Sequence, residues 1–138
     1  MTTPLRFTVA YGTVLVAALL PYICAAIAKW GAMRVARKDG GYDNHDPRAW
    51  LARQTDWRAR ANAAQANSFE GLPFFIGAVI IAHQLGAPQA TLDMLALAYV
   101  FVRLVYIMMY VADAATLRSA AWAVGILLNI AILFAGYR

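Results

Sequence analysis

Four long stretches of the chain carry almost no formal charge, and they constrain the fold more than any other feature. Residues 7–28 and 119–137 contain no Asp, Glu, Lys or Arg, residues 61–92 contain only Glu70, and residues 94–112 contain only Arg103. At 1.5 Å per residue the first stretch forms a helix of about 33 Å, which crosses a bilayer core of about 30 Å. We therefore expect four transmembrane helices near residues 6–36, 58–86, 89–113 and 118–137, within one domain spanning residues 1–138.

The composition supports a membrane protein and argues against other classes. Of 138 residues, 62% are hydrophobic and 14% charged, whereas soluble domains average about 25% charged residues. The balance argues against a soluble enzyme and a disordered chain. The net charge of +5 does not indicate a nucleic-acid partner, because basic residues also orient membrane proteins. Cys24 has no second cysteine to bridge, and His45 and His83 are isolated, so we expect neither a disulfide nor a metal site.

The connections predict an all-α, up-down four-helix bundle. The links near 86–88 and 114–117 are short, so successive helices should be antiparallel. The polar, glycine-rich segment 39–56 is the single long loop. Ala26-Ile27-Ala28 resembles a signal-peptide cleavage site, but Lys29, Arg34, Arg37 and Lys38 follow it directly and such a basic cluster resists translocation. We therefore interpret the first stretch as a mature helix.

The distribution of Lys and Arg predicts the orientation in the membrane. Eight basic residues surround the first loop, Arg118 lies in the third, and the second has none; the eight are Lys29, Arg34, Arg37, Lys38, Arg48, Arg53, Arg58 and Arg60. Arg6 and Arg138 lie near the termini. The positive-inside rule places the first and third loops in the cytoplasm and both termini outside. Short loops favour a bacterial inner membrane. For Arg48, Arg53 and Arg58 this orienting role suffices.

A polar stripe follows one face of the expected second helix. Arg60, Asn67 and Glu70 are spaced at i, i+7 and i+10, whereas Gln65 lies off the stripe. Pro73 has no N–H, so the carbonyl of Phe69 loses its usual helical donor. Since an ionisable group at bilayer depth costs at least about 2.5–3.5 kcal/mol, this stripe indicates pairing or function.

The expected third helix carries a matching stripe. Arg103, Tyr106, Tyr110 and Asp113 are spaced at i, i+3, i+7 and i+10 and end near the loop that holds Arg118. Two such stripes facing each other predict a basic pocket with tyrosine edges at the inner membrane surface. Guanidinium groups and phenolic hydroxyls can both donate to an anion, so the pocket suits a small peptide-like anion or a thiolate.

Purely structural interpretations remain open beside this one. Arg103 and Glu70 can neutralise each other inside the bundle, which is the role we favour for Arg103. Asn67 and Glu70 can also serve as hydrogen-bonding groups between helices. Tyr106 and Tyr110 can anchor the helix at the membrane interface, as we expect for Trp30, Trp50, Trp57 and Tyr137.

The two motifs together resemble a known family. The pattern Arg60-x6-Asn67-x2-Glu70-x2-Pro73-Phe74, followed by Arg103-x2-Tyr106-x3-Tyr110 and then Arg118, resembles the MAPEG family, the membrane-associated proteins in eicosanoid and glutathione metabolism. The resemblance extends over nearly the whole chain and suggests a bacterial-type member. It implies a homotrimer of four-helix protomers, with glutathione as cosubstrate between subunits and a lipophilic substrate arriving from the bilayer lipid.

The resemblance also implies roles for individual residues. Arg118 matches the arginine that stabilises the glutathione thiolate. The other matches are glutathione-binding positions: Arg37 or Lys38 for a carboxylate, Gln65, Asn67, Glu70, Tyr106 and Tyr110. Arg60, one helical turn before the position of the family arginine, is expected to substitute for that arginine with a different geometry. The expected activity is a glutathione-dependent transferase or peroxidase acting on lipophilic electrophiles.

Two other functions can be compared with this one, and the first of them stays open. The family enzymes usually carry an arginine seven positions before the motif glutamate, where this chain has Ala63. That departure favours a non-catalytic trimeric membrane protein that binds lipid or accompanies a larger complex, as the lipoxygenase-activating protein binds without catalysis. A small multidrug exporter also has four short spans, but the first loop here is too long and too basic for that class.

Overall fold

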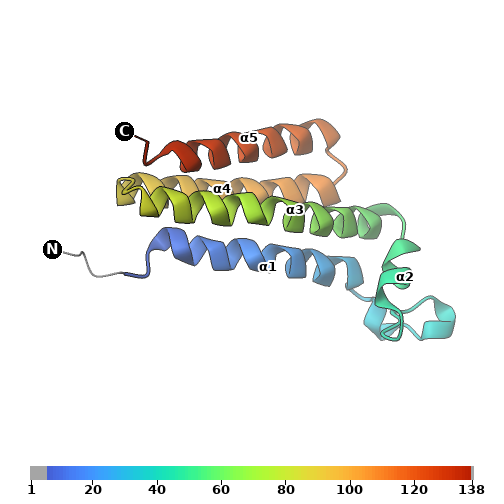
Figure 1. Ribbon diagram of the computed structural model, residues 1–138. Coiled ribbons are helices and arrows are strands. Elements are labelled where there is room, and N and C mark those ends of the chain that lie inside the picture. Colours follow the sequence, from blue (N-terminus) through green and yellow to red (C-terminus); the bar gives the residue numbers. More distant parts are fainter. Residues whose placement is uncertain (1–5, 138) are drawn as a thin grey trace.

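Four long helices run side by side in a computed structural model that describes residues 6–137 (Figure 1). They are α1 (Val9–Lys29), α3 (Asp56–Gln84), α4 (Gln89–Val111) and α5 (Ala115–Phe134). A short helix, α2 (Pro47–Ala52), and two 3₁₀ turns, Ala32–Arg34 and Arg37–Asp39, lie between α1 and α3. Residues 6–137 contain no strand. Arg138, one of the basic residues used to infer orientation, lies outside the described range.

All four of these helices have the length and the apolar composition needed to cross a membrane. The all-helical architecture fits the expected four-helix membrane bundle. We call the end of the bundle that carries residues 30–55 the loop end; α1 and α4 finish there, and α3 and α5 begin there (Figure 1). The two described termini lie at the opposite end.

Helix α1 is fixed by caps at its start and by a glycine at its end. The Thr8 hydroxyl accepts a hydrogen bond from the backbone N–H of Tyr11 at 3.2 Å, and Asp93 of α4 accepts one from Ala10 at 2.9 Å. The helix ends at Lys29, earlier than the boundary near residue 36 expected from the sequence. Gly31 follows with φ of +76°, a left-handed conformation that stops the helix and favours glycine.

The segment between α1 and α3 is folded around Trp50. This side chain is 4% exposed, meets the Tyr42 ring edge-on at 5.2 Å, and donates from its indole N–H to the carbonyl of Gly40 at 3.4 Å. Asp46 caps α2 by accepting from Ala49, and Pro47 occupies the first turn, where its missing N–H costs nothing. A segment expected to be only a loop therefore contains a helix.

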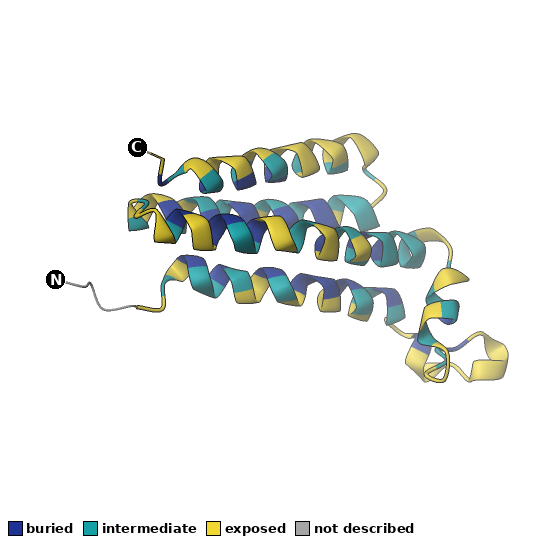
Figure 2. Ribbon diagram, in the orientation of Figure 1, coloured by how far each residue is buried: buried dark blue, intermediate teal, exposed yellow. Residues whose placement is uncertain are grey.

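Small residues let the long helices approach closely. The buried positions of α1 and α3 are rich in alanine, including Ala10, Ala17, Ala28, Ala61, Ala64, Ala78 and Ala82, as is common where membrane helices pack together. Phe75 of α3 stacks on Tyr99 of α4 with ring centroids 4.2 Å apart. The outer surface of α5 is largely exposed and apolar (Figure 2), so this surface faces lipid or another subunit.

Candidate functional site

Four of the residues predicted from the sequence meet in one pocket near the loop end. Its volume is about 240 Å³, and α3, α4 and α5 each contribute to its walls. The predicted residues are Asn67, Tyr106, Tyr110 and Arg118, and Ser119 and Trp122 complete the lining. We call this space the loop-end pocket.

Cation–π and aromatic contacts hold Arg118 at this pocket. Tyr106 and Tyr110 are one helical turn apart on α4, and their rings meet edge-on with centroids 5.6 Å apart. The chain turns at Asp113, which has φ of +62°, and α5 begins at Ala115. This tight turn brings Arg118 back over α4, with its guanidinium carbon 4.5 Å from the centroid of the Tyr110 ring. The pocket therefore has a cation held against a phenol.

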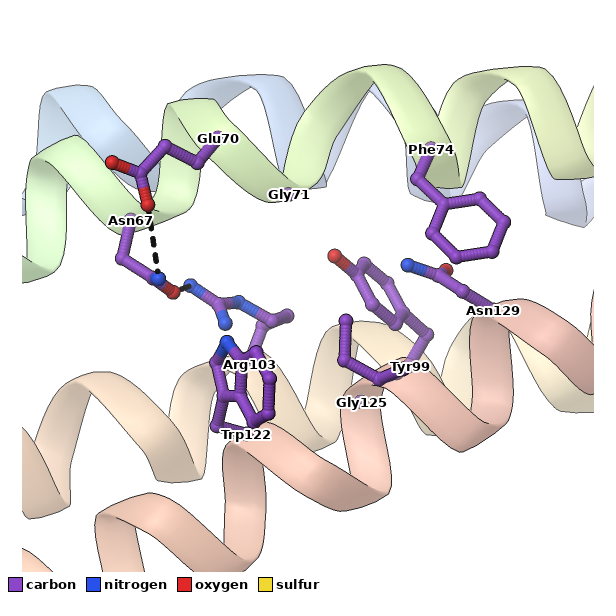
Figure 3. Close-up of a pocket in the computed structure, with 10 residues that line it drawn as sticks. Asn67, Glu70, Gly71, Phe74, Tyr99, Arg103, Trp122, Gly125 and Asn129 are labelled. Carbon is purple, nitrogen blue, oxygen red and sulfur yellow. Dashed lines mark hydrogen bonds between the residues drawn. The ribbon is translucent and has the colours of Figure 1, made fainter.

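Arg103 lies deeper and organises the polar groups of α3. Arg103 is only 5% exposed. Its Nη2 donates to the Asn67 side-chain oxygen at 2.9 Å and to the Ser68 hydroxyl at 3.3 Å. The guanidinium also lies 4.1 Å from the centroid of the Tyr106 ring. Because its oxygen is used by Arg103, Asn67 presents its NH₂ group to Glu70, to which it donates at 3.2 Å (Figure 3).

This arrangement corrects the ion pair expected between Arg103 and Glu70. The described residues show no contact of 4.0 Å or less between the two charges; their ion pairs are Arg37–Asp43 and Arg60–Asp113. Asn67 lies one turn before Glu70 on α3 and stands between carboxylate and guanidinium (Figure 3). Glu70 itself is exposed on the outer surface of the helix, so its carboxylate is left available to a ligand or a neighbour.

Gln65 faces a different part of the molecule from Asn67. Two residues along an α-helix correspond to a rotation of about 200°, so the two side chains leave α3 on nearly opposite sides. Gln65 lines a separate groove of about 400 Å³ that also includes Arg48, Asn62 and Ala63. Its side-chain oxygen is buried and has no hydrogen-bond partner in the described part of the chain. Within the described chain, Gln65 therefore does not reach the loop-end pocket.

Arg60 ties helices together instead of lining the loop-end pocket. Its Nε donates to the carbonyl of Val111 at 3.1 Å, and its Nη1 lies 4.0 Å from the Asp113 carboxylate. These contacts join the beginning of α3 to the end of α4. Arg60 thus supports the turn that positions Arg118, and it does not line the pocket itself.

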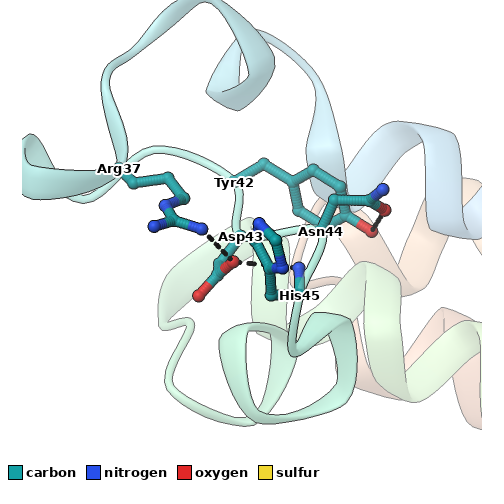
Figure 4. A network of polar contacts seen from close by, with 5 residues as sticks. All are labelled: Arg37, Tyr42, Asp43, Asn44 and His45. Carbon is teal, nitrogen blue, oxygen red and sulfur yellow. Dashed lines mark hydrogen bonds and ion pairs between the residues drawn. The ribbon is translucent and has the colours of Figure 1, made fainter.

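Arg37 and Lys38 lie in the connecting segment, away from that pocket. Arg37 donates to the Asp43 carboxylate at 3.3 Å, and Asp43 also accepts from the backbone N–H of His45 at 3.0 Å (Figure 4). The hydrogen bond from His45, with the charge of Arg37 adding to it, holds the pKa of the Asp43 carboxyl below its usual value. Lys38 is exposed.

The sequence analysis missed residues that line a second cavity. This cavity lies between α3, α4 and α5, and its lining includes Tyr99 and Asn129 beside the predicted Asn67 and Glu70 (Figure 3). Two features of the sequence could have identified Tyr99 and Asn129. Tyr99 precedes Arg103 by one helical turn and so extends the polar stripe, and Asn129 is an amide in an uncharged apolar stretch.

Comparison with known proteins gives one positive result. No curated protein and no solved structure matched the chain. The family model described as the MAPEG family matches residues 9–137, a range that includes all four long helices and every residue of the loop-end pocket. The chain is therefore an integral membrane protein, and it belongs to the MAPEG family.

Proposed function

We propose that the protein is a glutathione-dependent transferase or peroxidase that acts on lipophilic electrophiles at the membrane. Membership of the MAPEG family supports a membrane function related to glutathione in general. The observation that carries the more specific proposal is the Arg118 guanidinium, held over the Tyr110 ring at the loop-end pocket.

Arg118 supplies the electrostatics that thiol chemistry needs. A free thiol has a pKa of about 8.5, so only a small fraction is thiolate at neutral pH. A guanidinium within hydrogen-bond reach stabilises the thiolate and raises that fraction. The thiolate then attacks the electrophile, forming a C–S bond as the leaving group departs with its bonding electrons. Alternatively it attacks a hydroperoxide, breaking the O–O bond and releasing an alcohol, and a second glutathione converts the resulting sulfenic acid to glutathione disulfide and water. The contribution of the protein is to position the two reactants and to stabilise the negative charge.

The remaining residues bind the rest of glutathione in this proposal. Asn67 and Glu70 hold the backbone and the amino group, since one presents an amide and the other an exposed carboxylate. Tyr106 and Tyr110 form the aromatic wall. At about 240 Å³ the pocket of one protomer is smaller than the range of about 300–1,000 Å³ typical of ligand sites, so we infer that a neighbouring protomer completes it.

A homotrimer supplies the missing wall. The side chains separated from the pocket in one protomer, namely Gln65, Arg37 and Lys38, reach the ligand from the adjacent protomer. The partnerless oxygen of Gln65 supports this, because a buried acceptor without a donor is costly. We further propose that the loop end faces the cytoplasm, both termini face outside, and the protein resides in a bacterial inner membrane, where lipophilic substrates enter from the lipid.

The proposal is tested by replacing Arg118. We expect Arg118→Ala to lower turnover of glutathione with a haloarene acceptor by at least about tenfold, because the thiolate loses its counter-charge. Arg53→Ala is the matched control, since Arg53 is an exposed arginine of the connecting segment and its loss should leave turnover unchanged. An Arg118→Ala protein with wild-type turnover would remove Arg118 from the mechanism.

A non-catalytic binding protein is the second candidate, and the groove around Gln65 favours it. Ala63 lines this groove at the position where family enzymes usually carry an arginine, so one cation is missing from the proposed binding surface. Thermal unfolding of the detergent-purified protein discriminates the two. Glutathione at a hundred times its dissociation constant adds about 2.7 kcal/mol to apparent stability. No shift at millimolar glutathione would favour the non-catalytic function.

A further inference from the structure

The second cavity, which we call the inner cavity, lies deeper along the helices than the loop-end pocket. Its volume is about 240 Å³, and it is formed between α3, α4 and α5 (Figure 3). It shares Asn67 and Trp122 with the loop-end pocket. It also reaches Asn129, which follows Arg118 by eleven positions in α5 and therefore lies about 16 Å farther from the loop end. Such a depth lies within the hydrocarbon part of the bilayer.

The side-chain oxygen of Asn129 lacks a hydrogen-bond partner in the described part of the chain. The residue is 1% exposed, and its side-chain oxygen makes no hydrogen bond to any described residue. A buried amide oxygen without a donor costs about 1–3 kcal/mol, and no bulk water is available at this depth to offset that cost. Asn129, which lines the cavity, thus carries an acceptor oxygen that an O–H or N–H group of a bound molecule can satisfy.

Two hydrogen-bond donors also line the inner cavity, the Tyr99 hydroxyl and the Arg103 guanidinium. The Tyr99 side chain lies beside Asn129 (Figure 3), and its hydroxyl fills the room left by Gly71, where a Cβ atom would come within 3.2 Å. Arg103 makes both of its side-chain hydrogen bonds to described residues through Nη2, which leaves its other N–H groups for an acceptor. A matching ligand therefore combines a hydroxyl donor with an oxygen acceptor.

The walls indicate an aromatic and uncharged ligand. Phe74 and Trp122 line the cavity and are 38% and 48% exposed in the single chain, so two aromatic side chains border the cavity at the outer surface of the bundle. Arg103 and Glu70 both line the cavity, so neither sign of charge is favoured on the ligand. We propose that the inner cavity binds the hydroxyl-bearing aromatic head, a phenol or quinol, of a membrane-soluble amphiphile.

A pair of matched probes tests this binding without glutathione. The first is a decyl-substituted hydroquinone, and the second is its dimethyl ether, which keeps the ring and tail but has no O–H donor. Both are titrated by calorimetry into the wild-type protein in lipid nanodiscs. We expect the hydroquinone to bind at least about tenfold more tightly, since only it satisfies the Asn129 oxygen. Equal affinities for the two probes, which is the result expected if the cavity holds only water, would overturn the proposal.

Variants locate the binding in the cavity. Asn129→Leu removes the partnerless acceptor, so it should fold, and it should abolish the preference for the hydroquinone. Gly125→Leu adds a side chain at the cavity wall, where a Cβ meets nothing closer than 3.8 Å, and it should weaken both probes. Ile130→Leu, on the exposed surface of the same helix, is the control. A hydroquinone preference that survives Asn129→Leu, or tighter binding of oleic acid, would contradict the assignment. Because no assay contains glutathione, these outcomes are independent of the function proposed for the loop-end pocket.

Discussion

Arg103 shows how a guanidinium can be accommodated inside this bundle without a carboxylate in contact. Its charge is met by the oxygens of Asn67 and Ser68 and by the face of Tyr106. Neutral acceptors and an aromatic ring stabilise a cation less than an ion pair does, but they avoid burying a second charge. Arg103 also fixes which end of the Asn67 amide faces Glu70, and this orientation is part of the proposed binding surface.

The first prediction compares the partners of this guanidinium. Arg103→Met keeps a long side chain but leaves the Asn67 oxygen without its donor, and we expect the free energy of unfolding to fall by about 2 kcal/mol. Ser68→Ala removes a longer contact of 3.3 Å and a local bond to Ala64, and it should cost less than about 1 kcal/mol. Denaturation in mixed micelles measures both. Equal costs would show that the Asn67 bond does not dominate.

Residue-level prediction from the sequence succeeded where residues share one helix face. The stripe on α4 placed Tyr106 and Tyr110 together, as the structure does. It failed to identify the partner of Arg103, because spacing along a helix gives no rotation relative to its neighbour. Asn67 and Glu70 are one turn apart on α3, and only packing decides which of them meets the guanidinium.

Among the helices, the boundaries of α1 and α2 depend on a few local signals. Hydropathy alone predicts the four long helices, since each contains a long apolar stretch with few charged residues. It does not predict that α1 ends at Lys29, because Gly31 adopts a left-handed conformation that composition does not reveal. The Asp46-Pro47 pair is typical of a helix start, so α2 was within reach of the sequence analysis. Its packing around Trp50 was not, because that depends on contacts with Tyr42 and Gly40.

A second prediction concerns the start of α1. Asp93 accepts from the backbone of Ala10 at 2.9 Å and from the Gln89 side chain at 2.7 Å. Asp93→Ala should therefore cost about 1 kcal/mol, as the loss of a cap does, and it should speed hydrogen exchange at the Ala10 amide. Gln89→Ala leaves the cap in place and should have the smaller effect. Unchanged exchange in Asp93→Ala would mean that Thr8 suffices as a cap.

A third prediction follows from the lowered pKa of Asp43. A carboxyl whose pKa is lowered in the folded protein stabilises its surroundings above its usual pKa and loses that effect as pH falls through the lowered value. The hydrogen bond from the His45 amide should hence persist at neutral pH and weaken only in strong acid. An NMR titration of the His45 amide measures this. In Asp43→Asn the acid transition should vanish, whereas Asp39→Asn should retain it.

For the whole molecule, two sides of α3 line two separate spaces, the loop-end pocket and the groove around Gln65. Asn67 lies at the loop-end pocket with Arg118, and Gln65 lies in the groove with Ala63. In the proposed trimer, a closed ring of identical subunits would bring the pocket of each protomer against the groove of the next. This arrangement explains how residues on opposite sides of one helix can act on one ligand in the proposed trimer.

Mixed oligomers provide the fourth prediction. Arg118→Ala and Gln65→Leu should each reduce activity strongly as pure proteins. Co-expressed in equal amounts, they should restore about one quarter of the wild-type sites, because that share of random contacts pairs an intact pocket with an intact groove. Turnover per protomer in the purified mixture measures the recovery. Turnover no higher than the average of the two pure variants would place both residues in the same protomer or outside the site.

The contact between Ala10 and Asp93 has a consequence for biosynthesis. The carboxylate that accepts from the first turn of α1 lies 83 residues later in the chain. During translation this hydrogen bond can therefore form only after α4 has been synthesised. Until then the first turn of α1 relies on the hydrogen bond from the Tyr11 N–H to the Thr8 hydroxyl as its cap, so the docking of α4 completes the start of α1.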